Sequence, residues 1–175
     1  MKKMNNKGFS LVELIVVVLI MAIIAVALAP QVMKWVENSR VSTDCTNYES
    51  MVENLQLAIA DKEVYKVISA LDPATASTGI CYACIGEKGS TITATSADPA
   101  AKGTTVTTMP SSATMVEAVN FGLTKIDASW PEIAKKASAA SPAYYAIKIT
   151  SGKQANVAKV SANDPSTLKT GTDLS

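Results

Sequence analysis

The sequence predicts an α+β protein in which a long N-terminal helix packs on a small antiparallel β-sheet head. Three observations lead to this fold class. Residues 14–33 form a continuous run without a charged side chain. The apolar spacing of a helix continues after this run, and the alternation of a strand appears only in the C-terminal part. With 175 residues, the chain is long enough to bury one modest core.

Composition excludes several classes of function. The chain contains no histidine, so it lacks the commonest general base, the base that activates Ser and Cys nucleophiles, and a frequent zinc ligand. No glycine-rich phosphate loop or paired-carboxylate motif stands out. The net charge of +1 produces no strong field toward nucleic acid. We therefore predict no enzyme activity, no cofactor, no metal and no specific nucleic-acid binding.

The uncharged run predicts a membrane segment over residues 14–33. At about 1.5 Å of rise per residue it measures roughly 30 Å as a helix, the hydrocarbon thickness of a bilayer. Lys2, Lys3 and Lys7 precede it, and no acidic residue accompanies them. Positively charged flanks stay in the cytoplasm, so the rest of the chain is expected on the other side of the membrane.

A secretory signal peptide and a simple membrane anchor are two alternatives for this N-terminus. Residues 27–29 have the small-x-small pattern of a signal peptidase site, but Pro30 would follow the cut. Proline restricts the residue before it and lacks an amide hydrogen, which argues against cleavage there. Glu13 argues against a simple anchor, because an ionised side chain in lipid is costly without a partner.

Residues 7–14, with the sequence KGFSLVEL, and the apolar run after them resemble the N-terminus of type IV pilins and pseudopilins. The resemblance covers roughly residues 1–35. It implies that a prepilin peptidase removes the leader 1–8 by cutting after Gly8 and methylates the new amino group of Phe9. It also implies that Glu13 serves subunit assembly and that Pro30 bends the helix.

The chemistry of these positions agrees with the resemblance. The amino group of Phe9 and the Glu13 carboxylate of a neighbouring subunit attract strongly in a fibre core of low dielectric constant, where either charge alone is costly. Methylation keeps the positive charge of the amine. Pro30 cannot donate a hydrogen bond to the carbonyl of Val26, which predicts a kink or local melting of the helix.

The function implied by the resemblance is structural. The chain is expected as a single-pass protein of the cytoplasmic membrane, with a cytoplasmic N-terminus, that polymerises into an extracellular type IV pilus-like filament. The implied partners are further copies of the chain, the prepilin peptidase, an assembly ATPase and a platform protein. Glu13 favours a major pilin. Two alternatives stay open: a pseudopilin of a secretion or competence system, and an anchored or secreted extracytoplasmic binding domain. The head carries no motif that selects among cell adhesion, motility and DNA uptake.

The predicted helix covers residues 9–62, and its second half is amphipathic. Apolar residues recur there at intervals of three and four and line one side of the helix: Val41, Cys45, Tyr48, Val52, Leu55 and Ile59. Asp72 and Pro73 form a stop signal for any extension of the helix. Residues 63–175 are expected to form the β-rich head.

Further elements of the head follow from local signals. Glycines at three positions predict a connecting loop over residues 74–89. Alternation around Ser151, Gly152 and Lys153 predicts a β-hairpin. The remaining expected elements are the two strands of this hairpin (144–150 and 155–160), two short strands (91–95 and 105–107), and a helix that begins at Ser129 and ends near Ala140.

Cys45, Cys81 and Cys84 form an odd set in the part expected outside the membrane. The spacing of Cys81 and Cys84 occurs in redox and zinc motifs, but the βαβ context is missing, and Glu87 would have to replace the absent histidine. A disulfide from Cys45 to Cys81 or Cys84 would stabilise the fold by about 2–4 kcal/mol. Which cysteine pairs stays open, as does the alternative that all three remain reduced.

Overall fold

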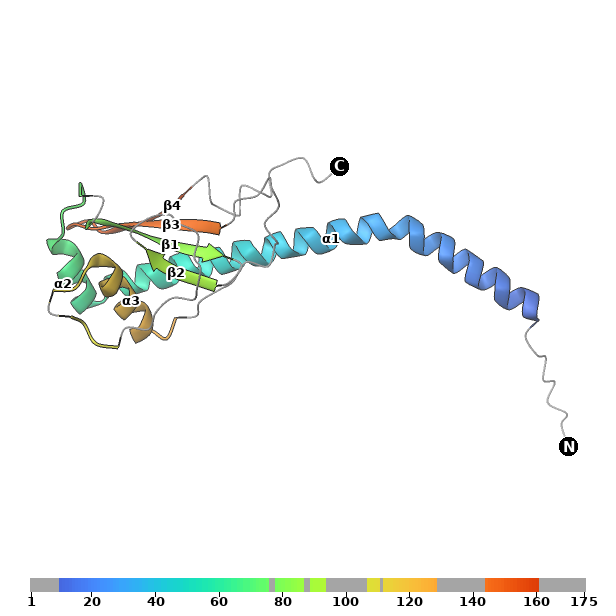
Figure 1. Ribbon diagram of the computed structural model, residues 1–175, viewed down its shortest axis with the longest axis horizontal. Coiled ribbons are helices and arrows are strands. Elements are labelled where there is room, and N and C mark those ends of the chain that lie inside the picture. Colours follow the sequence, from blue (N-terminus) through green and yellow to red (C-terminus); the bar gives the residue numbers. More distant parts are fainter. Residues whose placement is uncertain are drawn as a thin grey trace, which may run out of the picture. The chain divides into compact units, whose positions relative to one another are not determined.

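The structure is a computed structural model that describes residues 10–75, 78–86, 89–93, 107–110, 112–128 and 144–160. These residues form three helices and one four-stranded antiparallel sheet, so the predicted α+β fold class is confirmed (Figure 1). Contacts divide the chain into two compact units, residues 1–38 and residues 39–175.

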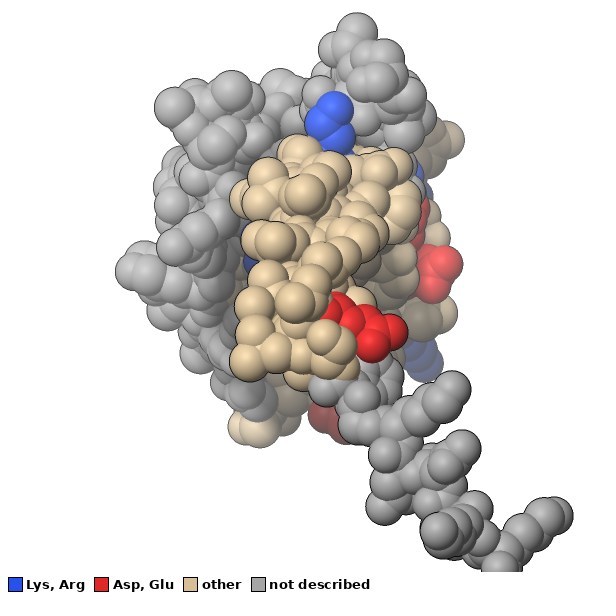
Figure 2. Space-filling view, turned by 90° about the vertical axis from the view of Figure 1, so that its right-hand side faces the viewer, with Lys and Arg blue, Asp and Glu red and all other residues tan. Residues whose placement is uncertain are grey.

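Helix α1, Leu11–Ala60, begins in the first unit and contains the entire apolar run. The chain stays helical on both sides of Pro30, so the proline does not melt the helix. This stretch is long and apolar enough to cross a membrane, and none of its most apolar 18-residue window is buried. In Figure 2, which faces the end of Figure 1 that carries this stretch, the described residues nearest the viewer are mostly tan, the colour of uncharged residues.

Asp61 separates α1 from helix α2, Lys62–Ala70. Its carboxylate accepts hydrogen bonds from the backbone amides of Glu63 at 2.9 Å and Val64 at 3.4 Å, which satisfies two amides that have no partner inside the helix. The long helix therefore ends at Ala60, two residues before the end expected at residue 62. The stop signal after Leu71 is also confirmed, because α2 does not extend beyond Ala70.

The sheet has the strand order β2-β1-β3-β4, and all neighbouring strands are antiparallel. The predicted hairpin is confirmed as β3, Tyr144–Thr150, and β4, Asn156–Lys159. Strand β2, Gly89–Thr93, covers the described part of the strand predicted at 91–95. Thr107, the one described residue of the strand predicted at 105–107, lies outside any strand. The helix predicted from Ser129 lies outside the described residues.

The loop predicted over residues 74–89 is wrong in its second half. Residues Ile80–Gly86 form β1, which pairs on one side with β2 and on the other with β3. Both faces of this central strand are largely buried, so its sequence ICYACIG lacks the clear alternation of a half-exposed strand. The neighbouring glycines, which favoured a loop, lie at the ends of the strands.

Helix α3, Met115–Lys125, is an element that the sequence analysis did not predict. Its start is a capping box: the Thr114 hydroxyl accepts a hydrogen bond from the Glu117 amide at 3.3 Å, and the Glu117 carboxylate accepts one from the Thr114 amide at 2.8 Å. The Thr-x-x-Glu pattern was therefore the signal available in the sequence for this helix.

The core of the second unit forms where the second half of α1 lies along one face of the sheet. Helices α2 and α3 lie near the C-terminal end of α1 (Figure 1). The predicted apolar stripe of α1 is confirmed in substance, since Val41, Tyr48, Val52 and Leu55 are buried and Cys45 and Ile59 are partly buried. The other fully buried large side chains include Met51, Val64, Ile68, Ile85, Val119, Leu123, Ile147 and Ile149.

Candidate functional site

Glu13 is an acidic residue in the first turn of α1. A negative charge is favourable there because the amides at a helix start carry partial positive charge. Its side chain is exposed between the exposed apolar side chains of Val12 and Leu14. Within the described residues the Glu13 carboxylate has no ion-pair partner. Gly8 and Phe9, the residues of the expected cleavage site, lie outside the described residues.

The surface of α1 from Leu11 to Val36 is almost entirely apolar, and its charged residues are Glu13 and Lys34. None of these side chains is buried, and the exposed ones include leucines, isoleucines and valines throughout the run. A helix that is apolar all round requires a partner that removes it from water, either lipid or other protein. The first unit therefore presents an apolar surface that needs covering, and Glu13 is the one acidic residue between Leu11 and Val36.

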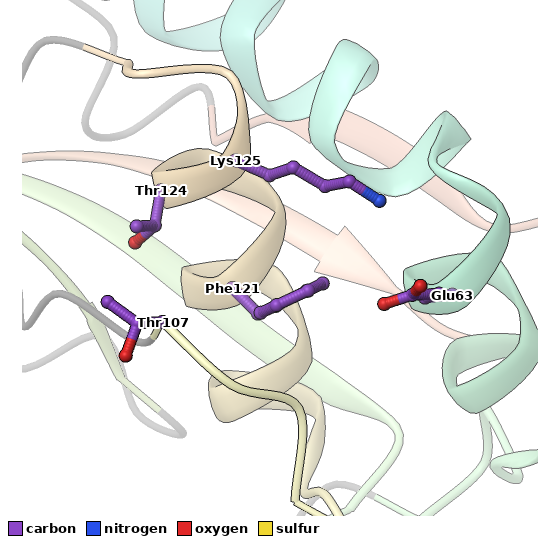
Figure 3. A pocket seen from close by; sticks show the side chains of 5 residues that line it. All are labelled: Glu63, Thr107, Phe121, Thr124 and Lys125. Atoms are coloured by element: carbon purple, nitrogen blue, oxygen red, sulfur yellow. The ribbon is translucent and has the colours of Figure 1, made fainter.

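The second unit contains a cavity of about 280 Å³ lined by Glu63, Thr107, Phe121, Thr124 and Lys125. Figure 3 shows Lys125 extending from α3 toward α2, with the Phe121 ring beside it. The Lys125 ammonium lies 2.8 Å from the Asp61 carboxylate and 5.7 Å from the centre of the Phe121 ring. The hydrogen bond between the two charged groups lowers the pKa of Asp61 and raises the pKa of Lys125. This ion pair therefore links the start of α2 to the end of α3.

The three cysteines lie in three different settings. Cys45 is partly buried on α1, Cys81 is buried on the core face of β1, and Cys84 is buried on the opposite face. Cys81 and Cys84 are three steps apart along the strand, about 10 Å, which is beyond the reach of a disulfide or of one zinc ion. Within the described part of the chain no group of three or more metal-ligating side chains occurs. Glu87 lies outside that part.

The strand register also separates Cys45 from Cys81. The Tyr145 hydroxyl donates a hydrogen bond to the carboxylate of Asp44, the neighbour of Cys45, at 3.4 Å. Tyr145 pairs with Ile85, which lies four residues from Cys81 along β1, about 13 Å at the rise of a strand. The structure therefore does not bring Cys45 beside Cys81. A bridge from Cys45 stays a prediction, which a count of thiols tests.

Burial determines the chemistry of the Cys81 thiol. Removal from water disfavours the thiolate, and with a smaller contribution from Cys84 this raises the pKa of Cys81 to about 12. A thiol with such a pKa is protonated at neutral pH and is a poor nucleophile. Cys81 is thus part of the core, in the company of Ile149 on the neighbouring strand.

Comparison with known proteins adds one finding. Residues 3–29 match a protein-family model, the prokaryotic N-terminal methylation motif. No curated protein and no solved structure matches the chain. The matched segment contains Gly8, Phe9 and Glu13, and it ends before the second unit begins.

The motif and the fold together support one class of protein. The chain carries the class III signal motif of type IV prepilins, followed by an apolar helix that is able to span a membrane and by a small α+β head. This combination supports a type IV pilin-like protein, a subunit of a pilus or of a pseudopilus. The resemblance seen in residues 7–14 is confirmed by this match.

Proposed function

We propose that this chain is the major pilin of a type IV pilus-like filament, stored in the cytoplasmic membrane and polymerised through its N-terminal helix. The observation that carries the proposal is Glu13. It is the one acid on an exposed apolar surface, and the described part of its own chain offers it no partner. A lone carboxylate is costly in lipid or in a fibre core, so its partner comes from another molecule.

Processing supplies the charge that Glu13 requires. Hydrolysis of the Gly8–Phe9 peptide bond consumes one water and releases the amine of Phe9, and the peptidase then transfers a methyl group to that amine from its methyl donor. The methylated amine keeps its positive charge. In the filament it pairs with the Glu13 carboxylate of a neighbouring subunit, and this pair sets the register of the incoming subunit.

The apolar surface of α1 determines where the subunit is stored and how it assembles. Burying one large aliphatic side chain is worth about 1.5–3 kcal/mol relative to water, and Leu11–Val36 exposes many of them. Lipid and a bundle of like helices are both apolar surroundings. Transfer from membrane to filament therefore exchanges one apolar environment for another, and the assembly ATPase and platform protein drive this transfer without exposing the helix to water.

The first test is the N-terminus of the mature protein. The chain is purified from its native host, and its first residue and intact mass are determined. We expect Phe9 as the first residue and one additional methyl group. An intact Met1, or a chain that begins at Pro30 or later, contradicts processing by a prepilin peptidase and leaves the head as an anchored or secreted binding domain.

The second test concerns Glu13. We expect Glu13→Ala to be cleaved and methylated normally but to be incorporated poorly into sheared extracellular filaments. Glu53→Ala is the matched control, because Glu53 is also an exposed acid on α1 but lies in the second unit. Normal filament yield from Glu13→Ala contradicts the role proposed for Glu13.

The third test separates a major pilin from a pseudopilin. Deleting the gene of a major pilin removes the surface filaments, and the chain itself is the most abundant protein in filaments of the parent strain. Filaments that persist after deletion, together with a defect in protein secretion or DNA uptake, indicate a pseudopilin instead.

A further inference from the structure

Trp35 ends the apolar stretch of α1. It lies two residues after Met33, and 62% of its surface is exposed. Lys34, the first charged residue after the uncharged run, is directly beside it in the sequence. While it faces water, an exposed indole gains nothing from its large apolar ring, whereas an apolar or interfacial environment would bury that ring.

The position of Trp35 along the helix matches one layer of a bilayer. The hydrocarbon core is about 30 Å thick and the whole bilayer about 40–45 Å, so each interfacial layer is roughly 5–8 Å thick. The uncharged run fills the hydrocarbon core. Trp35 lies about 3 Å beyond the end of that run at about 1.5 Å per residue, which is inside the interfacial layer.

The chemistry of the two side chains fits the same layer. An indole presents an apolar ring and one N–H donor, and tryptophan is enriched at membrane interfaces for this reason. A lysine extends its aliphatic stem along apolar surroundings and places its ammonium at the level of the phosphates. Both demands are met where acyl chains end and headgroups begin.

We propose that Trp35 and Lys34 anchor the stored subunit in the headgroup layer of the leaflet that faces away from the cytoplasm. The proposal rests on the membrane-stored state proposed above. It also gives Glu13 a place before assembly. The helix rises about 33 Å from Glu13 to Trp35, slightly more than the hydrocarbon thickness, so the carboxylate reaches the opposite interface when the indole occupies its own.

The depth of Trp35 is measured by fluorescence in vesicles. The full chain carrying Trp130→Phe, in which Trp35 is the remaining tryptophan, is reconstituted into vesicles of phosphatidylcholine and phosphatidylglycerol. Parallel samples contain lipids brominated near the carbonyl end or near the methyl end of the acyl chains. We expect blue-shifted emission and a larger loss of emission with bromine near the carbonyl end.

Two further chains calibrate the measurement. Ile24→Trp, made in a chain that also carries Trp35→Phe and Trp130→Phe, places the indole near the middle of the uncharged run, where bromine near the methyl end should quench more strongly. Trp35→Phe alone retains Trp130 and reports the emission that the head contributes, so the result does not depend on the Trp130→Phe chain folding normally.

Release of the chain from the same vesicles at alkaline pH is also measured. This second measurement tests membrane storage independently of the depth of Trp35. Emission typical of water and no quenching by either lipid, in a chain that resists extraction, overturns the anchoring role and leaves membrane storage intact. Stronger quenching near the methyl end likewise overturns it, because Trp35 then lies in the hydrocarbon core. Release of the chain by extraction contradicts membrane storage itself.

Discussion

Tyr48 connects α1 to the sheet with one side chain. Its ring is 1% exposed and meets the ring of Tyr145 edge to face, with centroids 6.4 Å apart and planes at 77°. Its hydroxyl donates a hydrogen bond to the carbonyl oxygen of Ala146 at 2.9 Å. The ring therefore contributes apolar contact and the hydroxyl fixes the position of β3 against the helix.

Tyr48→Phe keeps the ring and removes the hydroxyl. We expect a loss of about 1 kcal/mol in the free energy of unfolding, since a hydrogen bond contributes about 0.5–1.5 kcal/mol net. Tyr48→Ala should cost about 3–5 kcal/mol, because it also leaves a cavity. Urea unfolding measures both, with Ser50→Ala on the exposed side of α1 as the control. Equal losses for the two Tyr48 variants would mean that the ring adds nothing.

Cys81 offers a prediction about reactivity. With a pKa of about 12 and a buried side chain, it should remain unmodified by iodoacetamide at pH 8 in the folded chain. It should react fully in urea without reductant. Mass spectrometry of the peptide that contains Cys81 reads out both states. Modification in urea only after a reductant is added shows that Cys81 belongs to a disulfide.

Helix α3 is stabilised by a capping box at its start and by one close contact with α1. At its start, Thr114 and Glu117 satisfy each other's backbone groups. In its middle, a Cβ atom placed on Gly122 would lie 2.8 Å from the carbonyl oxygen of Ala58 and 2.9 Å from its Cβ. The two helices therefore touch through their backbones, and Gly122 is required because no side chain fits between them.

The capping box predicts a dependence of stability on pH. Hydrogen bonds from the amide and hydroxyl of Thr114 lower the pKa of Glu117 below its ordinary value of 4.5. A lowered pKa stabilises the folded chain fully above the unfolded-state value, and this contribution is lost as the pH falls through the folded-state value. We expect Glu117→Gln to lower the urea midpoint at pH 7, and the difference from the parent to shrink as the pH falls through the lowered pKa of Glu117. A difference that stays constant as the pH falls contradicts the assignment.

Gly122→Ala has two opposing effects of comparable size on the free energy of unfolding. Alanine is favoured over glycine in a helix interior by about 1 kcal/mol. Insertion of a methyl group into a packed contact costs about 1–3 kcal/mol, and here the group it meets is a backbone carbonyl that cannot rotate away. We expect net destabilisation in thermal or urea unfolding. A more stable Gly122→Ala chain would show that α1 and α3 separate at little cost.

The two units of the molecule differ in whether they bury their own apolar side chains. Residues 1–38 include an exposed apolar helix that needs lipid or other subunits, whereas residues 39–175 contain the buried core. The first buried side chain of α1 is Val41, so a cut between Asn38 and Ser39 removes no core residue. The proposed storage and assembly thus depend on the first unit, and the folding of the core depends on the second.

A chain of residues 39–175 should therefore fold alone. We expect cooperative urea unfolding followed by circular dichroism, and a monomer in sedimentation without detergent. The full chain should need detergent or lipid under the same conditions. A shorter chain that begins after Leu55 is the control, since it lacks Tyr48, Met51 and Leu55 and should not unfold cooperatively. Aggregation of the 39–175 chain contradicts the independence of the second unit.

Local patterns were sufficient for the features that depend on neighbours in the sequence. The uncharged run predicts a membrane-spanning helix, because its length and composition do not depend on distant residues. The methylation motif is likewise a short continuous pattern. The hairpin around Gly152 and the apolar stripe in the second half of α1 follow from turn chemistry and helical spacing.

Tertiary structure alone decided the features that depend on partners far along the chain. Ile80–Gly86 is the central strand because β2 and β3 pair with its two edges, and β3 lies more than half the length of the head away in sequence. Burial of both faces removes the alternation that identifies a strand. The same pairing makes this segment a strand, and side chains three positions apart in a strand point to opposite faces, so Cys81 and Cys84 do not converge on one redox or metal site.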